Sequence, residues 1–260
     1  MSADRGKLKN RVDALFARLR TERRCGLIAY VTCGDGDTVS IVEELEAAGA
    51  DAIELGIPFS DPIADGPVIQ AAAQRALARG TTLRDVFAIA RALRRRSEIP
   101  LIAFSYLNPI LRYGPERFAA DAKSAGIDSL LLTDLPPEVS GDVRDALHAQ
   151  GLGCVFLLAP TSTEARIRTV DKASDGFVYY VSTTGVTGTR NELDPALLGR
   201  LDEVRAALRR PIAVGFGISR HEHYTLLRDH CDAIVVGSAI VRALAEGRSA
   251  GEVVRGILGR

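Results

Sequence analysis

The segment from Asp51 to Pro67 contains the side chains best suited to acid–base chemistry. Glu54 lies within an apolar run typical of a β-strand, and Asp61 and Asp65 lie in the loop, rich in proline and glycine, that follows. If the run is a strand, alternation places Glu54 with small residues on one face and the isoleucine and leucine side chains on the other. A carboxylate there is costly unless it is paired, protonated or used in a reaction. Glu54 is therefore the first candidate for catalysis.

Eight strand-like runs alternate with amphipathic stretches along the chain. The predicted strands are 27–31, 52–56, 101–105, 129–133, 154–158, 177–181, 212–214 and 233–236. The predicted helices are 38–48, 83–95, 115–125, 137–149, 163–173, 195–208, 222–229 and a last one from 239 onward. This alternation predicts the α/β class and a single (β/α)8 TIM barrel, one domain over residues 1–260. An extra N-terminal helix, at about residues 7–19, would plug the bottom of the barrel.

A short pattern recurs where a predicted helix ends and a strand begins. It reads Ala-Gly-Ala-Asp-Ala-Ile at 48–53, Ala-Gly-Ile-Asp-Ser-Leu at 125–130 and His-Cys-Asp-Ala-Ile at 230–234. Asp51, Asp128 and Asp232 would thus lie at the N-terminal ends of strands, the face of a barrel that serves stability. We expect these three to be structural. Glu54 lies further along its strand, towards the C-terminal face where barrel active sites are built.

Two segments near the end of the chain predict a phosphate site. Gly-Phe-Gly-Ile-Ser (215–219) follows the seventh predicted strand, and Val-Gly-Ser-Ala-Ile (236–240) ends the eighth. Small residues there let backbone N–H groups approach an anion at a helix N-terminus, although these glycines could also serve tight turns alone. Arg220 replaces the third glycine of a dinucleotide fingerprint. A further glycine-containing segment, 182–190, is typical of a mobile lid.

Composition excludes several classes of partner and compartment. The chain has 33 basic and 33 acidic residues, so no overall field favours nucleic acid or an anionic membrane. The N-terminal residues contain no apolar run of signal-peptide length, and no window reaches the ~20 apolar residues of a membrane span. The four cysteines lie far apart without a CxxC pair. They predict reduced thiols in a cytoplasmic protein.

Lysine, metal and cysteine chemistry each lack the groups that they need. The lysines, none of which ends a predicted strand as a Schiff-base lysine would, are Lys7, Lys9, Lys123 and Lys172. His221 and His223 would point in different directions on a helix, so no metal site is expected. Cys33 follows the first strand but has no obvious histidine partner. What remains is acid–base chemistry, without metal or cofactor, on a phosphorylated substrate, with Glu54 and Asp65 as the best-placed carboxylates.

These residues resemble the tryptophan synthase alpha subunit family. The resemblance covers about residues 8–258 and rests on Glu-Leu-Gly-Ile-Pro-Phe-Ser-Asp-Pro-x-Ala-Asp-Gly-Pro (54–67), on Thr-Thr-Gly-Val-Thr-Gly (183–188), and on segments 215–219 and 237–241. It implies a lyase of L-tryptophan biosynthesis that cleaves indole-3-glycerol phosphate to indole and glyceraldehyde 3-phosphate. It also implies a beta subunit in an α2β2 complex, which holds pyridoxal phosphate and receives the indole through a tunnel, while this chain has no cofactor of its own.

The resemblance also implies roles for individual residues. Glu54 corresponds to the acid/base, whose apolar surroundings would raise its pKa, and Asp65 to the acid that accepts the indole N–H. The indole pocket would comprise Tyr30, Phe104, Leu131 and Tyr179, and the lid and phosphate site Thr187, Gly188, Gly217, Gly237 and Ser238. Tyr106 and Asn108 correspond to a loop that contributes to the subunit interface and to active-site closure, and Asp134 to a residue that would steady the lid.

Alternatives stay open at this stage. Glu54 could be a paired core acid, Asp65 and Asp134 turn residues, and the aromatic side chains ordinary barrel core. Another phosphate-binding barrel enzyme, a non-catalytic activating subunit and a stand-alone lyase are the competing functions. Gly36 stands where the family commonly has proline, so this loop is expected to be looser and the affinity for the beta subunit is left undetermined.

Overall fold

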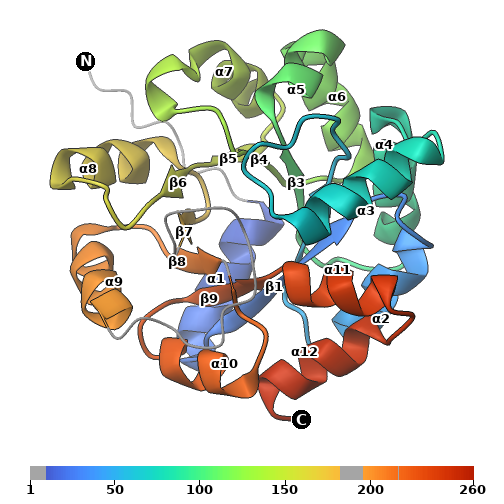
Figure 1. Ribbon diagram of the computed structural model, residues 1–260. Helices are drawn as coiled ribbons and strands as arrows, with labels where there is room; N and C mark the ends of the chain where they lie inside the picture. The colour runs from blue at the N-terminus through green and yellow to red at the C-terminus, as the bar shows by residue number, and fades with distance from the viewer. Residues whose placement is uncertain (1–9, 182–195, 216) are drawn as a thin grey trace.

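The strands of the computed structural model, which describes residues 10–181, 196–215 and 217–260, pair in parallel in one sheet (Figure 1). They are β1 (Gly26–Thr32), β2 (Ala52–Gly56), β3 (Leu101–Ser105), β4 (Ser129–Leu132), β5 (Gly153–Val155), β6 (Leu157–Leu158), β7 (Val178–Val181), β8 (Ile212–Gly215) and β9 (Ala233–Val236). Their order is β5-β4-β3-β2-β1-β9-β8-β7-β6. Only Phe156 separates β5 from β6 in the chain, so the two ends of this order meet. The predicted eight-stranded TIM barrel is confirmed, with its fifth strand interrupted once.

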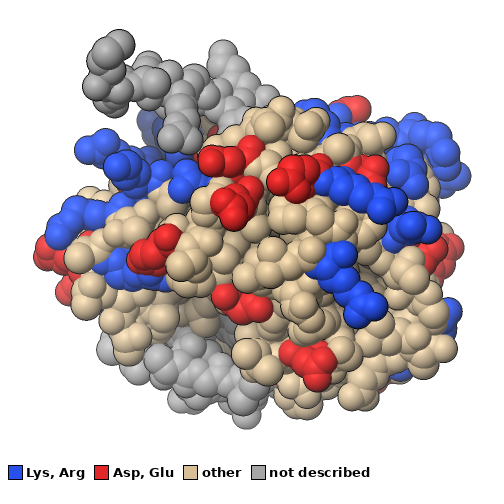
Figure 2. Space-filling view, turned by 90° about the horizontal axis from the view of Figure 1, so that it is seen from above, with Lys and Arg blue, Asp and Glu red and all other residues tan. Residues whose placement is uncertain are grey.

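Helices surround the strands (Figure 1). They are α1 (Arg11–Glu22), α2 (Thr38–Ala47), α3 (Pro67–Ala78), α4 (Leu83–Arg94), α5 (Leu107–Tyr113), α6 (Pro115–Ala125), α7 (Gly141–Ala149), α8 (Glu164–Ala173), α9 (Ala196–Ala207), α10 (His221–Leu227), α11 (Ser238–Ala245) and α12 (Ala250–Leu258), with a 3-10 turn η1 (Pro137–Val139). No helix among the described residues is long and apolar enough to cross a membrane. Acidic and basic side chains are interspersed on the face shown in Figure 2, in keeping with the net charge of zero.

The two largest apolar clusters lie on opposite faces of the strands, one inside and one outside the barrel. Ile53 and Leu55 of β2 belong to the large cluster between the strands and the helices. Ala52 belongs to the inner cluster, together with Ile28 of β1 and Phe177. Because side chains alternate along a strand, Glu54 lies on the inner face with Ala52. The predicted orientation of this strand is confirmed.

Helix α1 fills the N-terminal end of the barrel, as predicted. Its buried residues Val12, Leu15, Phe16 and Leu19 all belong to the inner cluster, and the ring of Phe16 lies 5.2 Å from that of Phe177. The Asn10 side chain caps the helix by accepting the backbone N–H groups of Val12 and Asp13. Since α1 occupies this end, only the C-terminal end of the barrel interior is left for a substrate.

The recurring aspartates join neighbouring strands at this N-terminal end. Each aspartate donates its backbone N–H to the carbonyl oxygen of a residue at the start of the preceding strand. Its carboxylate accepts the backbone N–H of that same residue. The pairs are Asp51 with Leu27, Asp128 with Leu101, Asp175 with Cys154 and Asp232 with Ile212, with N–O distances of 3.0, 2.9, 3.1 and 2.8 Å. The structural role predicted for three of them is confirmed. Asp175 is a fourth member that the sequence pattern did not identify.

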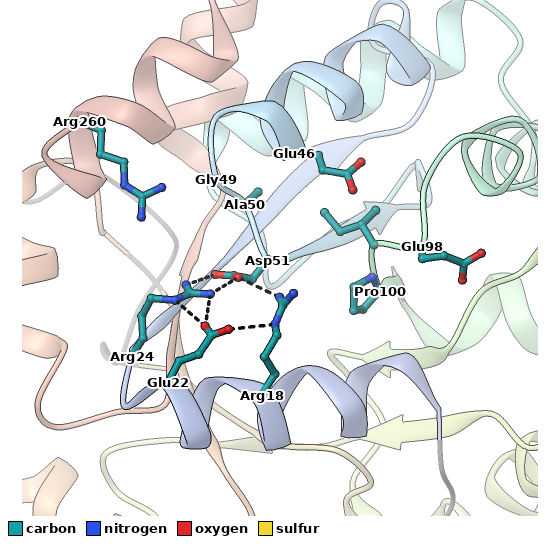
Figure 3. Close-up of a pocket in the computed structure, with 11 residues that line it drawn as sticks. Arg18, Glu22, Arg24, Glu46, Gly49, Ala50, Asp51, Glu98, Pro100 and Arg260 are labelled. Atoms are coloured by element: carbon teal, nitrogen blue, oxygen red, sulfur yellow. Dashed lines mark hydrogen bonds and ion pairs between the residues drawn. The ribbon is translucent and has the colours of Figure 1, made fainter.

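Cationic side chains complete this layer. Both oxygens of Asp51 accept hydrogen bonds of 2.7 Å from Arg24, and Arg18 of α1 lies 3.3 Å from Oδ1 (Figure 3). Asp128 similarly pairs with Arg11 at 3.0 Å and Arg94 at 3.4 Å. A hollow of about 460 Å³ opens beside Asp51 (Figure 3). Its walls carry charges of both signs, and it lies at the end of β2 opposite to the segment that contains Asp65.

Two helices were not predicted, and both follow strands that lead to the site. Helix α3 starts at Pro67, where the missing N–H of proline costs nothing, and buries Ile69 and Ala72. Helix α5 occupies the segment predicted as a loop around Asn108, so that prediction is wrong. The Oδ1 atom of Asp134 accepts the N–H of Leu107 at 2.7 Å and so caps α5; the lid that Asp134 was expected to steady lies outside the described residues.

Replacing Asp128 tests how much the layer of aspartates contributes to stability. The carboxylate is 3% exposed and accepts bonds from two arginines and from the backbone of Leu101. Asp128→Ala would leave these donors without an acceptor, so we expect a loss of about 2–4 kcal/mol in the free energy of unfolding, measured by urea titration. Glu164→Ala removes an exposed ion pair with Arg168 and serves as the control. Equal stability of the two variants would contradict the assignment.

Candidate active site

Glu54 lies in the interior of the barrel with almost no contact with water. It is 1% exposed, and its strand neighbours are Tyr30 of β1 and Ile102 of β3. The Oε1 atom is buried and makes no hydrogen bond with any described residue. An unpaired buried carboxyl oxygen costs about 1–3 kcal/mol, which a protein retains chiefly where the group has a function.

This environment changes the acidity of the carboxyl group. Burial raises the pKa of Glu54 to about 8, because the charged form loses its hydration and no described residue compensates for that loss. The expected direction is therefore confirmed. Near pH 7 the group is mostly protonated, and it can donate a proton and take one back within the working range of an enzyme.

Aromatic and apolar side chains surround Glu54 on the inner face. Phe104 lies opposite Leu131 in the sheet register, and its ring meets that of Tyr30 edge-on at 5.2 Å. Tyr30 and Tyr179 are each 5% exposed, and the charge of Glu54 contributes to raising the pKa of both. The structure thus brings together the four predicted pocket residues and Glu54. This wall suits a flat, apolar ring rather than a sugar or peptide.

Two glycines make room for the tyrosine rings. A Cβ atom at Gly56 would lie 2.2 Å from the hydroxyl oxygen of Tyr30, and one at Gly215 would lie 2.0 Å from that of Tyr179. Neither approach is possible for a larger residue without displacing the ring. Gly215, which the sequence associated with phosphate binding, is therefore required by the position of Tyr179.

Asp65 lies in the segment between β2 and α3 and is 6% exposed. Its backbone N–H donates to Pro62 at 3.1 Å and its carbonyl accepts from Gln70 at 2.8 Å, so the loop is fixed on both sides. Burial raises the pKa of its carboxyl to about 6, and a hydrogen bond from Tyr106 opposes that rise. Asp61 of the same loop is exposed and takes no part in this arrangement.

Tyr106 was expected in a loop of the subunit interface and active-site closure, but its contact with Asp65 was not predicted. It is 3% exposed and donates a hydrogen bond of 2.9 Å to Oδ2 of Asp65. Its ring packs 5.2 Å from that of Phe59. The signal was present in the sequence, because Tyr106 follows directly on β3 at the C-terminal end of the barrel, where polar residues serve the active site.

The predicted phosphate site is only partly described. Gly237 precedes α11 and Ser238 is its first residue, so the unpaired N–H groups of this helix end face the C-terminal end of the barrel. Gly217 has a φ of 80°, which only glycine adopts readily. Thr187 and Gly188 lie outside the described residues.

The alternative chemistries find little support in this part of the molecule. The thiol of Cys33 is fully buried, and burial raises its pKa to about 12, so it stays protonated and is a poor nucleophile. The described residues contain no group of three or more histidine, cysteine, aspartate or glutamate side chains that could hold a metal ion.

The loop that carries Gly36 is held by hydrogen bonds, although Gly36 stands where the family commonly has proline. Gly36 has a φ of 108°, which a proline ring cannot adopt. The preceding Asp35 accepts two hydrogen bonds from Arg75 of α3, at 2.8 and 2.6 Å. Gly36 thus has a backbone conformation that is closed to proline, and α3 anchors the loop through Arg75.

Comparison with known proteins agrees with this geometry. The model of the family described as tryptophan synthase alpha chain matches residues 16–256. The chain belongs to this family. A tryptophan synthase alpha chain from Solibacter usitatus is 53% identical over 239 residues, which are 91% of this chain and 90% of the relative.

Solved structures give the same result. Tryptophan synthase subunit alpha from Legionella pneumophila is 34% identical with a TM-score of 0.87, over 96% of this chain and 97% of that one. A chain from the tryptophan synthase α2β2 complex of Pyrococcus furiosus is 40% identical with a TM-score of 0.85, over 90% and 98%. The family and its activity, expected from the resemblance, are confirmed: this chain is a lyase of tryptophan biosynthesis that cleaves indole-3-glycerol phosphate to indole and glyceraldehyde 3-phosphate.

Proposed function

We propose that Glu54 is the acid/base of this cleavage and that Asp65 accepts the indole N–H. The buried carboxyl of Glu54, with an oxygen that no described residue satisfies, is the observation that supports this most. It lies among the aromatic side chains that suit an indole ring, and it has a pKa of about 8. A structural acid in a barrel core would instead be paired, as Asp51 and Asp128 are.

In this proposal the carboxyl group of Glu54 performs both proton transfers of the cleavage. The protonated Glu54 donates its proton to C3 of the indole ring, and positive charge develops on the ring nitrogen. The resulting carboxylate removes the proton from the hydroxyl group on the adjacent chain carbon. The bond from C3 to that carbon breaks, its electron pair returns to the ring, and the aldehyde forms. Glu54 ends the cycle protonated, as it began.

Asp65 serves the charge that develops in the first step. As a carboxylate it accepts the ring N–H and stabilises the protonated ring, and it does so most effectively in a buried site. Its pKa of about 6 keeps it ionised at neutral pH while Glu54 stays protonated. The two carboxyl groups thus take different roles because burial and hydrogen bonding give them different pKa values.

We propose that the remaining predicted residues bind the substrate. Tyr30, Phe104, Leu131 and Tyr179 would hold the ring, and backbone groups of Gly188, Gly217, Gly237 and Ser238 would hold the phosphate, with Thr187 linking the lid to Asp65. The N-terminal end of α11 supports this placement, since phosphates bind where helix N–H groups are free.

We further propose that the chain acts with a beta subunit, which would hold pyridoxal phosphate and receive the indole. The relative from Pyrococcus furiosus forms an α2β2 complex. In this chain Ile63, Leu111 and Val139 are 80%, 54% and 69% exposed and belong to the segments after β2, β3 and β4. Three large apolar side chains, exposed on the segments that follow neighbouring strands, suit the core of a protein interface.

Glu54→Gln tests the acid/base. The amide cannot donate a proton to C3, so indole release by the purified chain should fall by about 10²–10⁴-fold. The raised pKa also predicts a stability effect. The folded protein retains this proton up to about pH 8, whereas the unfolded chain loses it at the ordinary pKa of glutamate. The parent therefore loses stability as the pH rises between these two values. The variant should therefore melt at a higher temperature than the parent at pH 9. Asp61→Asn, in the exposed part of the loop, is the matched control. A variant with more than a tenth of the parent rate would contradict the role.

The pH dependence of kcat/KM tests the assignment of both groups. Activity requires ionised Asp65, so it should be lost as the pH falls through about 6. It also requires protonated Glu54, so it should be lost as the pH rises through about 8. We expect a bell-shaped profile in initial-rate measurements on the chain alone. A rate that stays level from pH 5 to pH 9 would exclude this pair.

Leu111→Asp and Val139→Asp test the partner surface. A buried charge at a protein interface is costly, so each should weaken binding of a matched beta subunit about tenfold or more in titration calorimetry. Leu226→Asp is the control, because Leu226 is 48% exposed on α10. Indole release by the isolated chain should be unchanged in all three, and adding the beta subunit should accelerate the parent. Equal release with and without the beta subunit would instead indicate a stand-alone lyase.

A further inference from the structure

The hydroxyl group of Tyr106 bridges two consecutive residues of the loop that carries Asp65. It accepts the backbone N–H of Ala64 at 2.9 Å and donates to Oδ2 of Asp65 at 2.9 Å. The packing of its ring against Phe59, from the same loop, fixes the direction of approach. Tyr106 itself follows β3, so these contacts join the segments after two different strands.

We propose that Tyr106 is a positioning residue, which holds one oxygen of the Asp65 carboxylate so that the other is left for the N–H of the substrate ring. This inference rests on the proposed role of Asp65 and adds to it the group that orients this carboxylate. Oδ2 is the oxygen held by Tyr106, whereas Oδ1 makes no hydrogen bond with any described residue.

The direction of the hydrogen bonds follows from the donors present. The N–H of Ala64 can only donate, so it occupies a lone pair of the Tyr106 oxygen and leaves the hydroxyl proton for Asp65. Bonds in such a chain strengthen one another, and a bond to an ionised carboxylate is stronger than one between neutral groups. Tyr106 stays protonated, because burial and the nearby charge of Asp65 raise its pKa above the ordinary value.

Few other charged groups act on this carboxylate. Tyr30 of β1 and Tyr179 of β7 are the further titratable side chains whose pKa values the charge of Asp65 raises, and both also interact with Glu54 of β2. No arginine, lysine or histidine contributes to the pKa of Asp65 among the described residues. Tyr106 is thus the one described side chain that contributes to the pKa of Asp65 beyond the effect of burial.

Tyr106→Phe isolates this contribution, because it removes the hydroxyl group and keeps the ring against Phe59. We expect kcat/KM for indole release to fall about tenfold, mainly through kcat if the contact serves the charged transition state. The acidic limb of the pH profile, at about 6 in the parent, should move to higher pH by about one unit, since the bond from Tyr106 lowers the pKa of Asp65. The alkaline limb, which belongs to Glu54, should stay in place.

Two further variants keep the outcomes apart. Tyr113→Phe removes another tyrosine hydrogen bond to a carboxylate, that of Asp121, at the surface of α5 and α6, and should change neither limb. Asp65→Asn tests the role on which the inference rests. If Asp65→Asn is inactive and Tyr106→Phe shows an unmoved acidic limb with a lower melting temperature, Tyr106 is merely structural and the inference fails. If Asp65→Asn retains the parent activity, the proposed role of Asp65 itself is wrong.

Discussion

The rest of the site depends on the removal of the Glu54 carboxyl group from water. Helix α1 fills the N-terminal end of the barrel, and aromatic side chains occupy the level of Glu54, so water is excluded and no cation of the described residues stabilises the charged form. An acid of ordinary pKa would be ionised at neutral pH and could not protonate carbon. Burial without a partner costs stability, and the barrel tolerates that cost because its large outer cluster is built independently of this residue.

The second carboxyl group shows how the same fold produces the opposite ionisation state. Asp65 is nearly as buried as Glu54, yet it has a donor in Tyr106 and lies in a loop rather than on the inner face of a strand. Burial raises the pKa of both groups, to about 8 for Glu54 and about 6 for Asp65; the value for Asp65 is lower because aspartate is the stronger acid to begin with and because Tyr106 donates a hydrogen bond to it. Between these values Glu54 is protonated and Asp65 is ionised, as their proposed roles of acid and counter-charge require.

Much of this arrangement was predictable from the sequence, and the failures have physical causes. Alternation along 52–56 gave the inward direction of Glu54, and the repeated aspartates gave the N-terminal layer, because both depend on local periodicity. Asp175 was missed because the residues around it differ from the repeat, although its contacts are the same. The contact of Tyr106 with Asp65 was missed because it depends on the distance between the segments that follow two different strands, which no local pattern contains. Helix α5 was missed because Asp134, 27 residues away, caps it.

Helix α5 connects the site with the exposed apolar surface. Tyr106 precedes its first residue, Asp134 holds its first N–H, and Leu111 projects from it at 54% exposure. A partner that bound Leu111 would therefore act on a rigid element whose N-terminal end holds Asp65 through a single hydrogen bond. Because a bond of this kind is sensitive to small displacements, the helix could change the position of the carboxylate without any movement of the barrel strands. Glu54, fixed within β2, would be unaffected, so a partner would act on the counter-charge and leave the acid unchanged.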